Sequence, residues 1–185
     1  MDHTEQQYSQ VARLLHWIMA VLVLAMIAAG FLMMQEGLGR PLRNALFIFH
    51  KNTGILLLIL GLLRIAYRLA YRPPPLPAGI PGWQARAAGA SHLALYALLV
   101  VMPVAGYIRV KAGGFPIEML DALGIPALVP RSDMLAELAK ATHHYGAIVI
   151  TGIILAHVSA ASYHGLIRRD GVFSRIWPPL VRRPR

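Results

Sequence analysis

Apolar residues along this chain come in long uninterrupted runs instead of the short alternating patterns that are typical of a soluble fold. Residues 14–34, 87–108 and 141–167 contain no Lys, Arg, Asp or Glu, which gives runs of 21, 22 and 27 residues. Each run reaches the roughly 20 residues that an α-helix needs to cross the hydrocarbon core of a bilayer. We therefore expect a membrane-spanning helix in each of the three runs.

A fourth span is expected at residues 44–67, where only Lys51 and Arg64 are charged. Both lie toward the ends of the span, where long basic side chains reach the headgroups. A buried or re-entrant segment is the alternative, but it would spoil the charge pattern described below. The pattern predicts an all-α fold, a transmembrane four-helix bundle that forms one domain over residues 1–185, with helices at about 11–35, 44–70, 87–110 and 132–168.

Composition supports the membrane class, because 57 % of the residues are hydrophobic and 14 % are charged, against roughly 25 % charged in soluble domains. The first apolar run is longer than the roughly 7–15 residues of a signal-peptide core, so we expect it to be retained as a helix. The net charge of +10 does not indicate nucleic acid, because the basic residues lie at helix ends without interleaved aromatic residues. No nucleic-acid partner is expected.

The distribution of Lys and Arg predicts the orientation of the bundle. One side receives 11 basic residues, namely Arg13, Arg64, Arg68, Arg72, Arg86, Arg168, Arg169, Arg175, Arg182, Arg183 and Arg185. The other side receives 7 basic residues and five of the eight acids, the basic residues being Arg40, Arg43, Lys51, Arg109, Lys111, Arg131 and Lys140. Since the more basic side faces the cytoplasm, both termini are expected to be cytoplasmic. The tail is also placed to contact anionic lipid.

Prolines and glycines mark the two longer connections. The sequence YRPPPLPAGIPGW at residues 71–83 cannot be helical throughout, because proline lacks a backbone N–H. The connection at residues 111–130 is rich in glycine and proline and is expected on the periplasmic side. Ser132 or Asp133 can cap the fourth helix, and Gly171 can end it.

The absence of cysteine excludes disulfides, thiolate metal sites, iron–sulfur clusters and covalently attached c-type haem. Any metal must therefore be held by histidine. Histidines occur at six places within or at the ends of the spans: His16, His50, His92, His143 or His144, His157 and His164. One imidazole in a membrane helix can simply hydrogen-bond a neighbouring helix, but the arrangement of this set favours a cofactor.

Helical spacing places two of these rings on one face of the fourth helix. At 100° per residue, the fourteen steps from His143 to His157 fall about 40° short of four turns, with a rise of about 21 Å. His144 lies about 140° from that face, so His143 is the better partner and His144 is the fallback. His16 lies at the cytoplasmic depth of His157, and His50 lies at the periplasmic depth of His143. Two layers thus hold two histidines each, from different helices.

Two facing imidazoles without a carboxylate or thiolate nearby fit the axial ligands of a b-type haem, because a tetrahedral zinc site takes three or four protein ligands. Two such layers predict two haems. A flat macrocycle also needs room. Gly54 and Gly61 lie about 40° and 20° from the direction of His50, and Gly30 lies about 40° from that of His16. Close helix packing is the alternative role of these glycines.

Four stretches resemble the bacterial cytochrome b561 family of di-haem membrane proteins, which includes superoxide oxidase: LLHWIMAVLVL, FIFHKNTGILLLILGLLRIAYRLAYRPPP, SHLALYALLVVMPVAGY and THHYGAIVITGIILAHVSAASYHGLIRRDG. The likeness covers nearly the whole chain and includes His-Trp in the first stretch and Met-Pro-x-x-Gly in the third. It implies a multi-pass protein of the bacterial inner membrane with two haem b groups that exchanges electrons with a quinone pool.

Carried over to this sequence, the resemblance implies an inner haem held by His16 and His157 and an outer haem held by His50 and His143, in agreement with the helical geometry. With both axial positions of each iron filled, the chemistry is outer-sphere electron transfer. Two haems can store two electrons, which is the number that a quinone needs. The leading hypothesis, taken from the family, is that superoxide is oxidised at the outer haem and ubiquinone is reduced near the inner haem with cytoplasmic protons.

Other polar residues are candidates for supporting roles. His92 and His164 lie at cytoplasmic helix ends, where they either hydrogen-bond and protonate a quinone or bind haem propionates or helix carbonyls. Arg64, Arg68 and Arg168 are candidate propionate partners. On the periplasmic side, a basic rim is a candidate for steering superoxide toward the outer haem, with anchoring at the membrane interface as its alternative role; this rim consists of Lys51, Arg109, Lys111 and Lys140.

Two other functions stay open at this point. The chain can be a membrane anchor that passes electrons between quinone and a partner dehydrogenase or hydrogenase, with the connection at 111–130 as the docking surface. It can also be a haem-free proton or metal-ion transporter that uses its histidines as relay or ligands. A visible spectrum separates the transporter from the cytochrome, because only the cytochrome shows a sharp α-band after reduction with dithionite.

Overall fold

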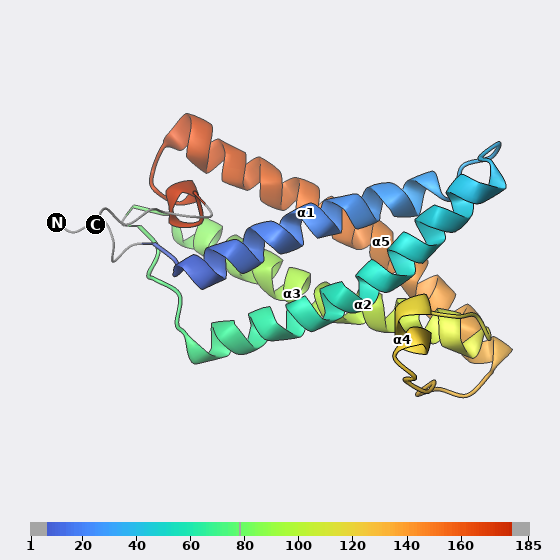
Figure 1. Ribbon diagram of the computed structural model, residues 1–185. Helices are drawn as coiled ribbons and strands as arrows, with labels where there is room; N and C mark the ends of the chain where they lie inside the picture. The colour runs from blue at the N-terminus through green and yellow to red at the C-terminus, as the bar shows by residue number, and fades with distance from the viewer. Residues whose placement is uncertain (1–6, 78, 179–185) are drawn as a thin grey trace, which may run out of the picture.

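Four long helices make up the molecule in its computed structural model, which describes residues 7–77 and 79–178. They are α1 (Gln10–Leu32), α2 (Arg40–Ala70), α3 (Gly82–Ala112) and α5 (Asp133–Ser162), and α5 continues into a π-helical segment, η2 (Tyr163–Arg168) (Figure 1). All four are long and apolar enough to cross a membrane. The predicted all-α fold with four spans is confirmed.

Local sequence sets the start of two of these helices. α2 begins at Arg40, four residues earlier than expected, because Pro41 in the first turn needs no intrahelical donor. α5 begins at Asp133, after Ser132, whose Oγ accepts a hydrogen bond from the backbone N–H of Leu135 at 3.3 Å. Ser132 is therefore the N-cap, one of the two residues that the sequence offered for this role.

The end of the last span departs from ideal helix geometry. The backbone changes from α to π geometry at Tyr163, and Arg169 then adopts a left-handed conformation with φ 50°. Gly171, which was expected to end the helix, has φ 87° in the turn that follows. The chain then forms the short 3-10 helix η3 (Phe173–Arg175) and folds back toward α1.

The helices pack in the order α1–α2–α3–α5. The described chain begins and finishes at one end of the bundle, which we call the terminal end and which also carries the connection at 71–81 (Figure 1). Gln7 Nε2 donates to the carbonyl of Ser174 at 3.3 Å, and Trp17 Nε1 donates to the carbonyl of Ile176 at 3.0 Å. The opposite end, called the loop end, carries the connections at 33–39 and 113–132. A short helix that was not predicted, α4 (Glu118–Ala122), lies in the second of these.

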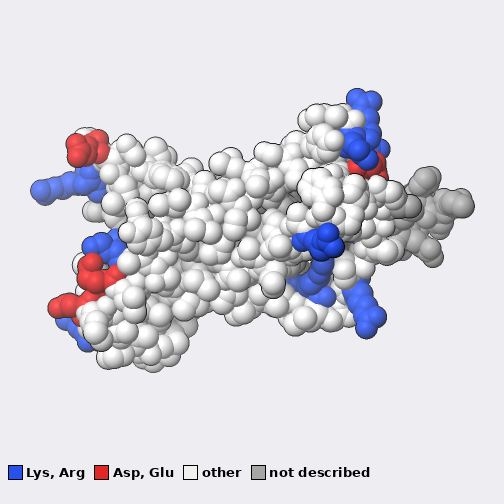
Figure 2. Space-filling model, turned by 180° about the vertical axis from the view of Figure 1, so that it is seen from behind, with Lys and Arg blue, Asp and Glu red and all other residues white. Residues whose placement is uncertain are grey.

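Charged side chains lie toward the two ends of the bundle, and the face in Figure 2 has a broad uncharged band between them. On that face, acidic residues gather mainly at the loop end. Large apolar side chains are exposed along all four spans, as for Val21, Leu63, Leu93 and Leu155, and an apolar surface of this extent indicates contact with lipid. Three basic residues of the expected cytoplasmic tail, Arg182, Arg183 and Arg185, lie outside the described residues.

Candidate functional site

Two pairs of histidine side chains face each other across the bundle. The ring centres of His16 on α1 and His157 on α5 are 6.3 Å apart, with an angle of 70° between the ring planes. The ring centres of His50 on α2 and His143 on α5 are 6.0 Å apart, with an angle of 74°. These are the same pairs that helical spacing placed in common layers. We call them the inner pair, at the terminal end, and the outer pair, at the loop end.

The separation within each pair fits one iron bound between two imidazoles. A metal–imidazole nitrogen bond is about 2 Å long and the ring centre lies roughly 1.1 Å behind that nitrogen, so two axial rings have their centres about 6 Å apart. Within residues 7–77 and 79–178, no group of three or more His, Asp or Glu side chains could hold a bare metal ion. The donors present therefore fit two bis-histidine haems better than a zinc site.

The outer pair is oriented by neighbouring helices. Nδ1 of His143 lies 3.0 Å from the carbonyl oxygen of Met102 on α3. When Nδ1 donates to this carbonyl, Nε2 is left free for a metal, as in most metal-ligating histidines. Glycines make space for both rings, because a Cβ at Gly106 would lie 3.3 Å from Cε1 of His143 and a Cβ at Gly30 would lie 3.3 Å from Cε1 of His50.

The Met-Pro-x-x-Gly sequence of α3 thus forms one wall of the outer site. Met102 provides the carbonyl, and Gly106 provides the space for the ring of His143. Pro103 between them lies inside the helix and cannot donate a backbone hydrogen bond. No role for Met102 or Gly106 was predicted from the sequence. A proline inside an apolar run was the available signal, but helical spacing alone does not tell which neighbouring helix such a motif faces.

The glycines that were expected to make room for haem have other contacts. A Cβ at Gly61 would meet a backbone carbonyl of α3 at 3.6 Å, and a Cβ at Gly54 would meet a side chain of α1 at 3.7 Å. Both positions therefore serve close helix packing, which was the alternative role. Gly30 was assigned to the face of His16, but it lies against His50, because fourteen residues of helix carry it about 21 Å from His16 into the other layer.

Arg64 of α2 reaches into the inner layer. Its guanidinium donates to the carbonyl of Ala12 at 3.0 Å and lies 3.3 Å from Nδ1 of His16. A ring nitrogen that accepts from arginine carries no proton, whereas a histidine bound to iron through Nε2 carries its proton on Nδ1. Arg64 therefore has to release His16 for this ring to bind iron, and a carboxylate is the partner that a guanidinium prefers.

His157 has a second imidazole neighbour. The ring centre of His92 on α3 lies 5.5 Å from that of His157, which is shorter than the roughly 6 Å expected across one iron. The pair of His16 and His157 instead repeats the geometry of the outer pair. His92 therefore lies beside the inner pair. It is closer to His157 than we expected for a residue predicted at the end of its helix.

A cleft of about 220 Å³ opens at the terminal end next to the inner pair, and its lining is basic and aromatic, with Arg64, Arg68, Arg72, Tyr8, Tyr67 and Tyr96 among the lining residues. Arg68 donates to the hydroxyl of Tyr8 at 3.3 Å, and its guanidinium lies 5.9 Å from the centre of that ring. Within the described part of the chain, no carboxylate lines the cleft. The cleft is therefore suited to anionic groups.

The two remaining histidines among the described residues are in different surroundings. His144, the fallback ligand, is exposed on α5, and its ring centre lies 5.3 Å from that of Tyr145. His164 lies in η2, and its Nδ1 is 2.6 Å from Oδ2 of Asp170. Burial by itself raises the pKa of Asp170, but hydrogen bonds from His164 and from the N–H of Val172 outweigh this and hold the pKa below its ordinary 3.8. This pair was not predicted from the sequence.

Three of the four residues of the basic rim at the loop end are in ion pairs. Lys51 Nζ lies 2.7 Å from Glu118 Oε1, Lys111 pairs with Asp121, and Lys140 Nζ lies 3.0 Å from Glu137 Oε2. The fourth, Arg109, has no acidic partner in the part of the chain that the structure describes. The ion pairs reduce the positive field that the lysines can exert on an approaching anion.

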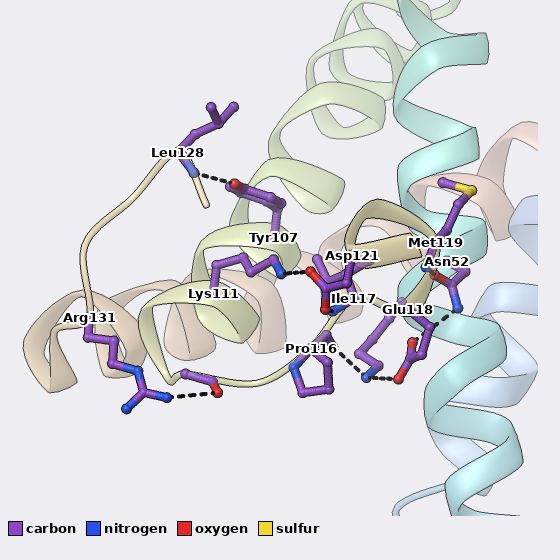
Figure 3. Close-up of polar contacts among 12 residues, drawn as sticks. Asn52, Tyr107, Lys111, Pro116, Ile117, Glu118, Met119, Asp121, Leu128 and Arg131 are labelled. Atoms are coloured by element: carbon purple, nitrogen blue, oxygen red, sulfur yellow. Dashed lines mark hydrogen bonds and ion pairs between the residues drawn. The ribbon is translucent and has the colours of Figure 1, made fainter. Parts of the chain in front are cut away.

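The first two ion pairs fix α4 between α2 and α3 (Figure 3). Asn52 of α2 reinforces the contact, because it donates to Glu118 Oε2 at 3.1 Å and accepts from the N–H of Met119 at 2.9 Å. Desolvation by itself raises the pKa of Glu118, but the hydrogen bond from Lys51 outweighs it and lowers the pKa below 4.5. The hydrogen bond from Lys111 likewise lowers the pKa of Asp121.

Comparison with known proteins shows the family of this chain. A family model described as prokaryotic cytochrome b561 matches residues 7–179. The chain is 30 % identical over 175 residues to cytochrome b561 homolog 2 of Escherichia coli (strain K12), covering 94 % of this chain and 93 % of that protein. It is 28 % identical over 172 residues to cytochrome b561 homolog 1 of the same organism, covering 93 % and 97 %. The chain therefore belongs to the prokaryotic cytochrome b561 family, the multi-pass membrane proteins that transfer electrons through b-type haem.

Proposed function

We propose that this protein carries electrons across the bacterial inner membrane through two b haems, with His16 and His157 as ligands of the inner one and His50 and His143 as ligands of the outer one. The observation that carries the proposal is the presence of two facing imidazole pairs, 6.3 and 6.0 Å apart, in separate layers. When bound, each haem would supply a one-electron redox centre held by two histidines of this chain.

The residues around the two pairs hold the ligands and complement the cofactor charge. The carbonyl of Met102 fixes the proton of His143 on Nδ1, so that Nε2 faces the iron position. Arg64 and Arg68 line the cleft beside the inner pair and are the partners for the propionate carboxylates. The terminal end then faces the cytoplasm, because it holds most of the basic residues and the acids concentrate at the loop end.

The function that fits this arrangement best is superoxide:ubiquinone oxidoreductase, or superoxide oxidase. Two superoxide ions would each give up one electron at the loop end and leave as dioxygen, and one ubiquinone would take up both electrons, with two protons, at the terminal end. His92 and His164 lie on the cytoplasmic side of the bundle, where an imidazole can donate protons to the reduced quinone, which takes up two. Within the basic rim the three lysines are already paired with acids, so Arg109 is the rim residue that steers superoxide most strongly.

A second candidate function is that of a membrane anchor which passes electrons between quinone and a partner dehydrogenase or hydrogenase. It is favoured by the connection at 113–132, which is fixed by the ion pairs of α4 and exposes large apolar side chains. Phe115, Leu123 and Leu128 are 65 %, 68 % and 78 % exposed. A haem-free transporter does not fit a member of a cytochrome family.

Stopped-flow mixing of the purified oxidised protein with superoxide, without any partner, tests the proposal. We expect fast appearance of the reduced α-band and net reduction of added ubiquinone. Arg109→Gln should slow the bimolecular step several-fold at low ionic strength, while Lys51→Gln, which removes a paired charge, should slow it less. Absence of fast haem reduction by superoxide would exclude the oxidase and favour the anchor.

A further inference from the structure

The inner pair comes from two helices that hardly pack on each other. His16 lies on α1 and His157 lies on α5, with their ring centres 6.3 Å apart. α1 packs on α2 and α5 packs on α3, whereas α1 and α5 have little direct backbone contact. The direction of His16 relative to His157 therefore depends on further contacts at the terminal end.

Residues 170–178, which we call the C-terminal segment, are seated on the continuation of α5. The segment follows η2 directly, and its short helix η3 packs on η2. Phe173 lies against Gly165 of η2, where a Cβ would be 3.0 Å from Cγ and 3.1 Å from Cβ of Phe173. A larger residue at Gly165 would therefore displace Phe173 and the C-terminal segment with it.

Hydrogen bonds join the same segment to α1. Trp17 Nε1 donates to the carbonyl of Ile176 at 3.0 Å. Gln7 Nε2 donates to the carbonyl of Ser174 at 3.3 Å, and Gln7 Oε1 accepts from the guanidinium of Arg13 at 3.0 Å. Arg13 is only 3 % exposed, so this second link also ends on the buried face of α1. The C-terminal segment thus connects α1 to the helix that carries His157.

A series of ring contacts leads from His16 to the same seat. The ring centre of Trp17 lies 5.5 Å from that of His16 and 5.2 Å from that of Trp177, both in edge-to-face geometry. Trp177 in turn stacks on Phe173, with the ring centres 6.1 Å apart and an angle of 20° between the planes. The His-Trp sequence of α1 was part of the family resemblance, but no role was predicted for Trp17. In the structure, Trp17 is the residue of this series that contacts both His16 and the C-terminal segment.

Small rotations of α1 are large on the scale of a metal ligand. Side chains reach roughly 5–6 Å from the axis of a helix, so a rotation of about 10° would move the imidazole of His16 by about 1 Å. Ligand distances in metal sites stay within about 0.2 Å of their ideal values. Trp17 follows His16 and lies about 100° from it around α1. A contact that holds Trp17 therefore resists this rotation from a side of α1 that His16 does not face.

We propose that Trp17 is a positioning residue for the inner haem: its contacts with the C-terminal segment fix the rotation of α1 and so aim the ring of His16 at His157. The inference rests on the proposed function, which assigns these two histidines to the inner haem. The outer pair lies at the loop end, and its ligands come from α2 and α5, so it does not depend on Trp17. An effect on one haem and not on the other is therefore the signature of this role.

The first test measures the hydrogen bond of Trp17 itself. The chain has three tryptophans, so ¹⁵N labelling of tryptophan gives three indole N–H signals, and the signal of Trp17 is the one that disappears in Trp17→Phe. We expect this N–H to exchange with D₂O about 2- to 10-fold faster in Gly165→Val than in the wild type, the range of one hydrogen bond. Equal exchange in the two proteins would overturn the link between Trp17 and the C-terminal segment.

The second test follows each haem separately in Trp17→Phe, which keeps an aromatic ring and removes the donor. We expect release of the inner haem to apomyoglobin to be about 2- to 10-fold faster than in the wild type, while the outer haem is released at the wild-type rate. The low-spin EPR signal of the oxidised inner haem should also shift, because it depends on the angle between the two axial rings. His157→Ala identifies the signals of the outer haem. Trp83→Phe, the same exchange at a position of α3 that is 64 % exposed, is the matched control.

The outcomes separate this inference from the proposed function. A His157→Ala protein that keeps both haems overturns the ligand assignment of the proposed function, and the inference with it. Loss of one haem in His157→Ala, together with wild-type haem release and a wild-type EPR signal in Trp17→Phe, overturns the role of Trp17 alone. If Trp17→Phe does not assemble with haem, Gly165→Val decides, because it displaces the C-terminal segment and leaves Trp17 unchanged. Faster release of the inner haem in Gly165→Val supports the inference, and an unchanged rate overturns it.

Discussion

Replacement of Gly106 by valine is expected to remove the outer haem and spare the inner one. A Cβ at this position would lie 3.3 Å from Cε1 and 3.4 Å from Nδ1 of His143, which is already closer than the optimal separation of about 3.5–4.0 Å. The methyl groups of valine extend about 1.5 Å beyond Cβ. They would occupy space that the ring fills now, so the ring of His143 has to move.

The displacement is large on the scale that metal ligation tolerates. Ligand distances in metal sites stay within about 0.2 Å of their ideal values, and changes in the groups that orient a ligand commonly lower affinity about 10- to 100-fold. The hydrogen bond from His143 to Met102 would be lost together with the ring position. We expect Gly106→Val to retain one haem per chain, and Gly106→Ala to lose less because a shift of a few tenths of an ångström accommodates one methyl group.

Haem content per polypeptide, measured as the pyridine haemochrome of purified protein, checks this expectation. Gly152→Val is the matched control on α5, because Gly152 lies nine residues and about 180° from His143 and nothing lies within 4 Å of its Cβ position. Circular dichroism shows whether the helices are intact. A Gly106→Val protein with two haems and a wild-type spectrum would refute the position of His143 in the outer site.

Three further predictions address the inner site and α4. His157→Ala should lose the inner haem and keep the outer one, while His92→Ala should keep both; spectra of the purified variants decide, and loss of a haem in His92→Ala would contradict the pairing. Arg64→Gln should lower the inner haem potential by tens of millivolts, because loss of a nearby cation disfavours the reduced state; an unchanged potential in a redox titration would show that Arg64 lies away from the haem. Glu118, whose pKa is below 4.5, should stabilise α4 fully above pH 4.5 and lose its contribution as the pH falls through the lower folded value. For this partly exposed pair we expect about 0.2–1 kcal/mol, and equal amide protection factors of α4 at pH 7 and pH 3, each corrected for the intrinsic exchange rate at that pH, would contradict it.

The sequence predicted the spans and the histidine layers because one physical constraint dominates each of them. A helix in lipid has to satisfy its backbone internally, so uncharged runs of sufficient length define the spans. α5 stays a regular helix from Asp133 to Ser162, so the spacing of His143 and His157 translates directly into a shared face. Geometry of this kind depends on a single helix, so it can be predicted from the spacing of residues in the sequence.

Contacts between elements were not predictable in the same way. The place of Gly30 beside His50 and of His92 beside His157 depends on how neighbouring helices are aligned, which a single helical period does not contain. The pair of His164 and Asp170 depends on a change to π geometry and a left-handed residue, which ideal rotation excludes. The acids that pair with the lysines of the loop end lie partly on α4, which has no signal in the apolar pattern.

The central claim, two haems held by two histidine pairs in one chain, is tested most directly by the haem stoichiometry and spectrum of the purified protein. We predict two b haems per polypeptide, with a low-spin oxidised spectrum and a sharp α-band after reduction with dithionite. A protein without haem, with one haem per chain, or with high-spin iron would contradict the two-pair arrangement.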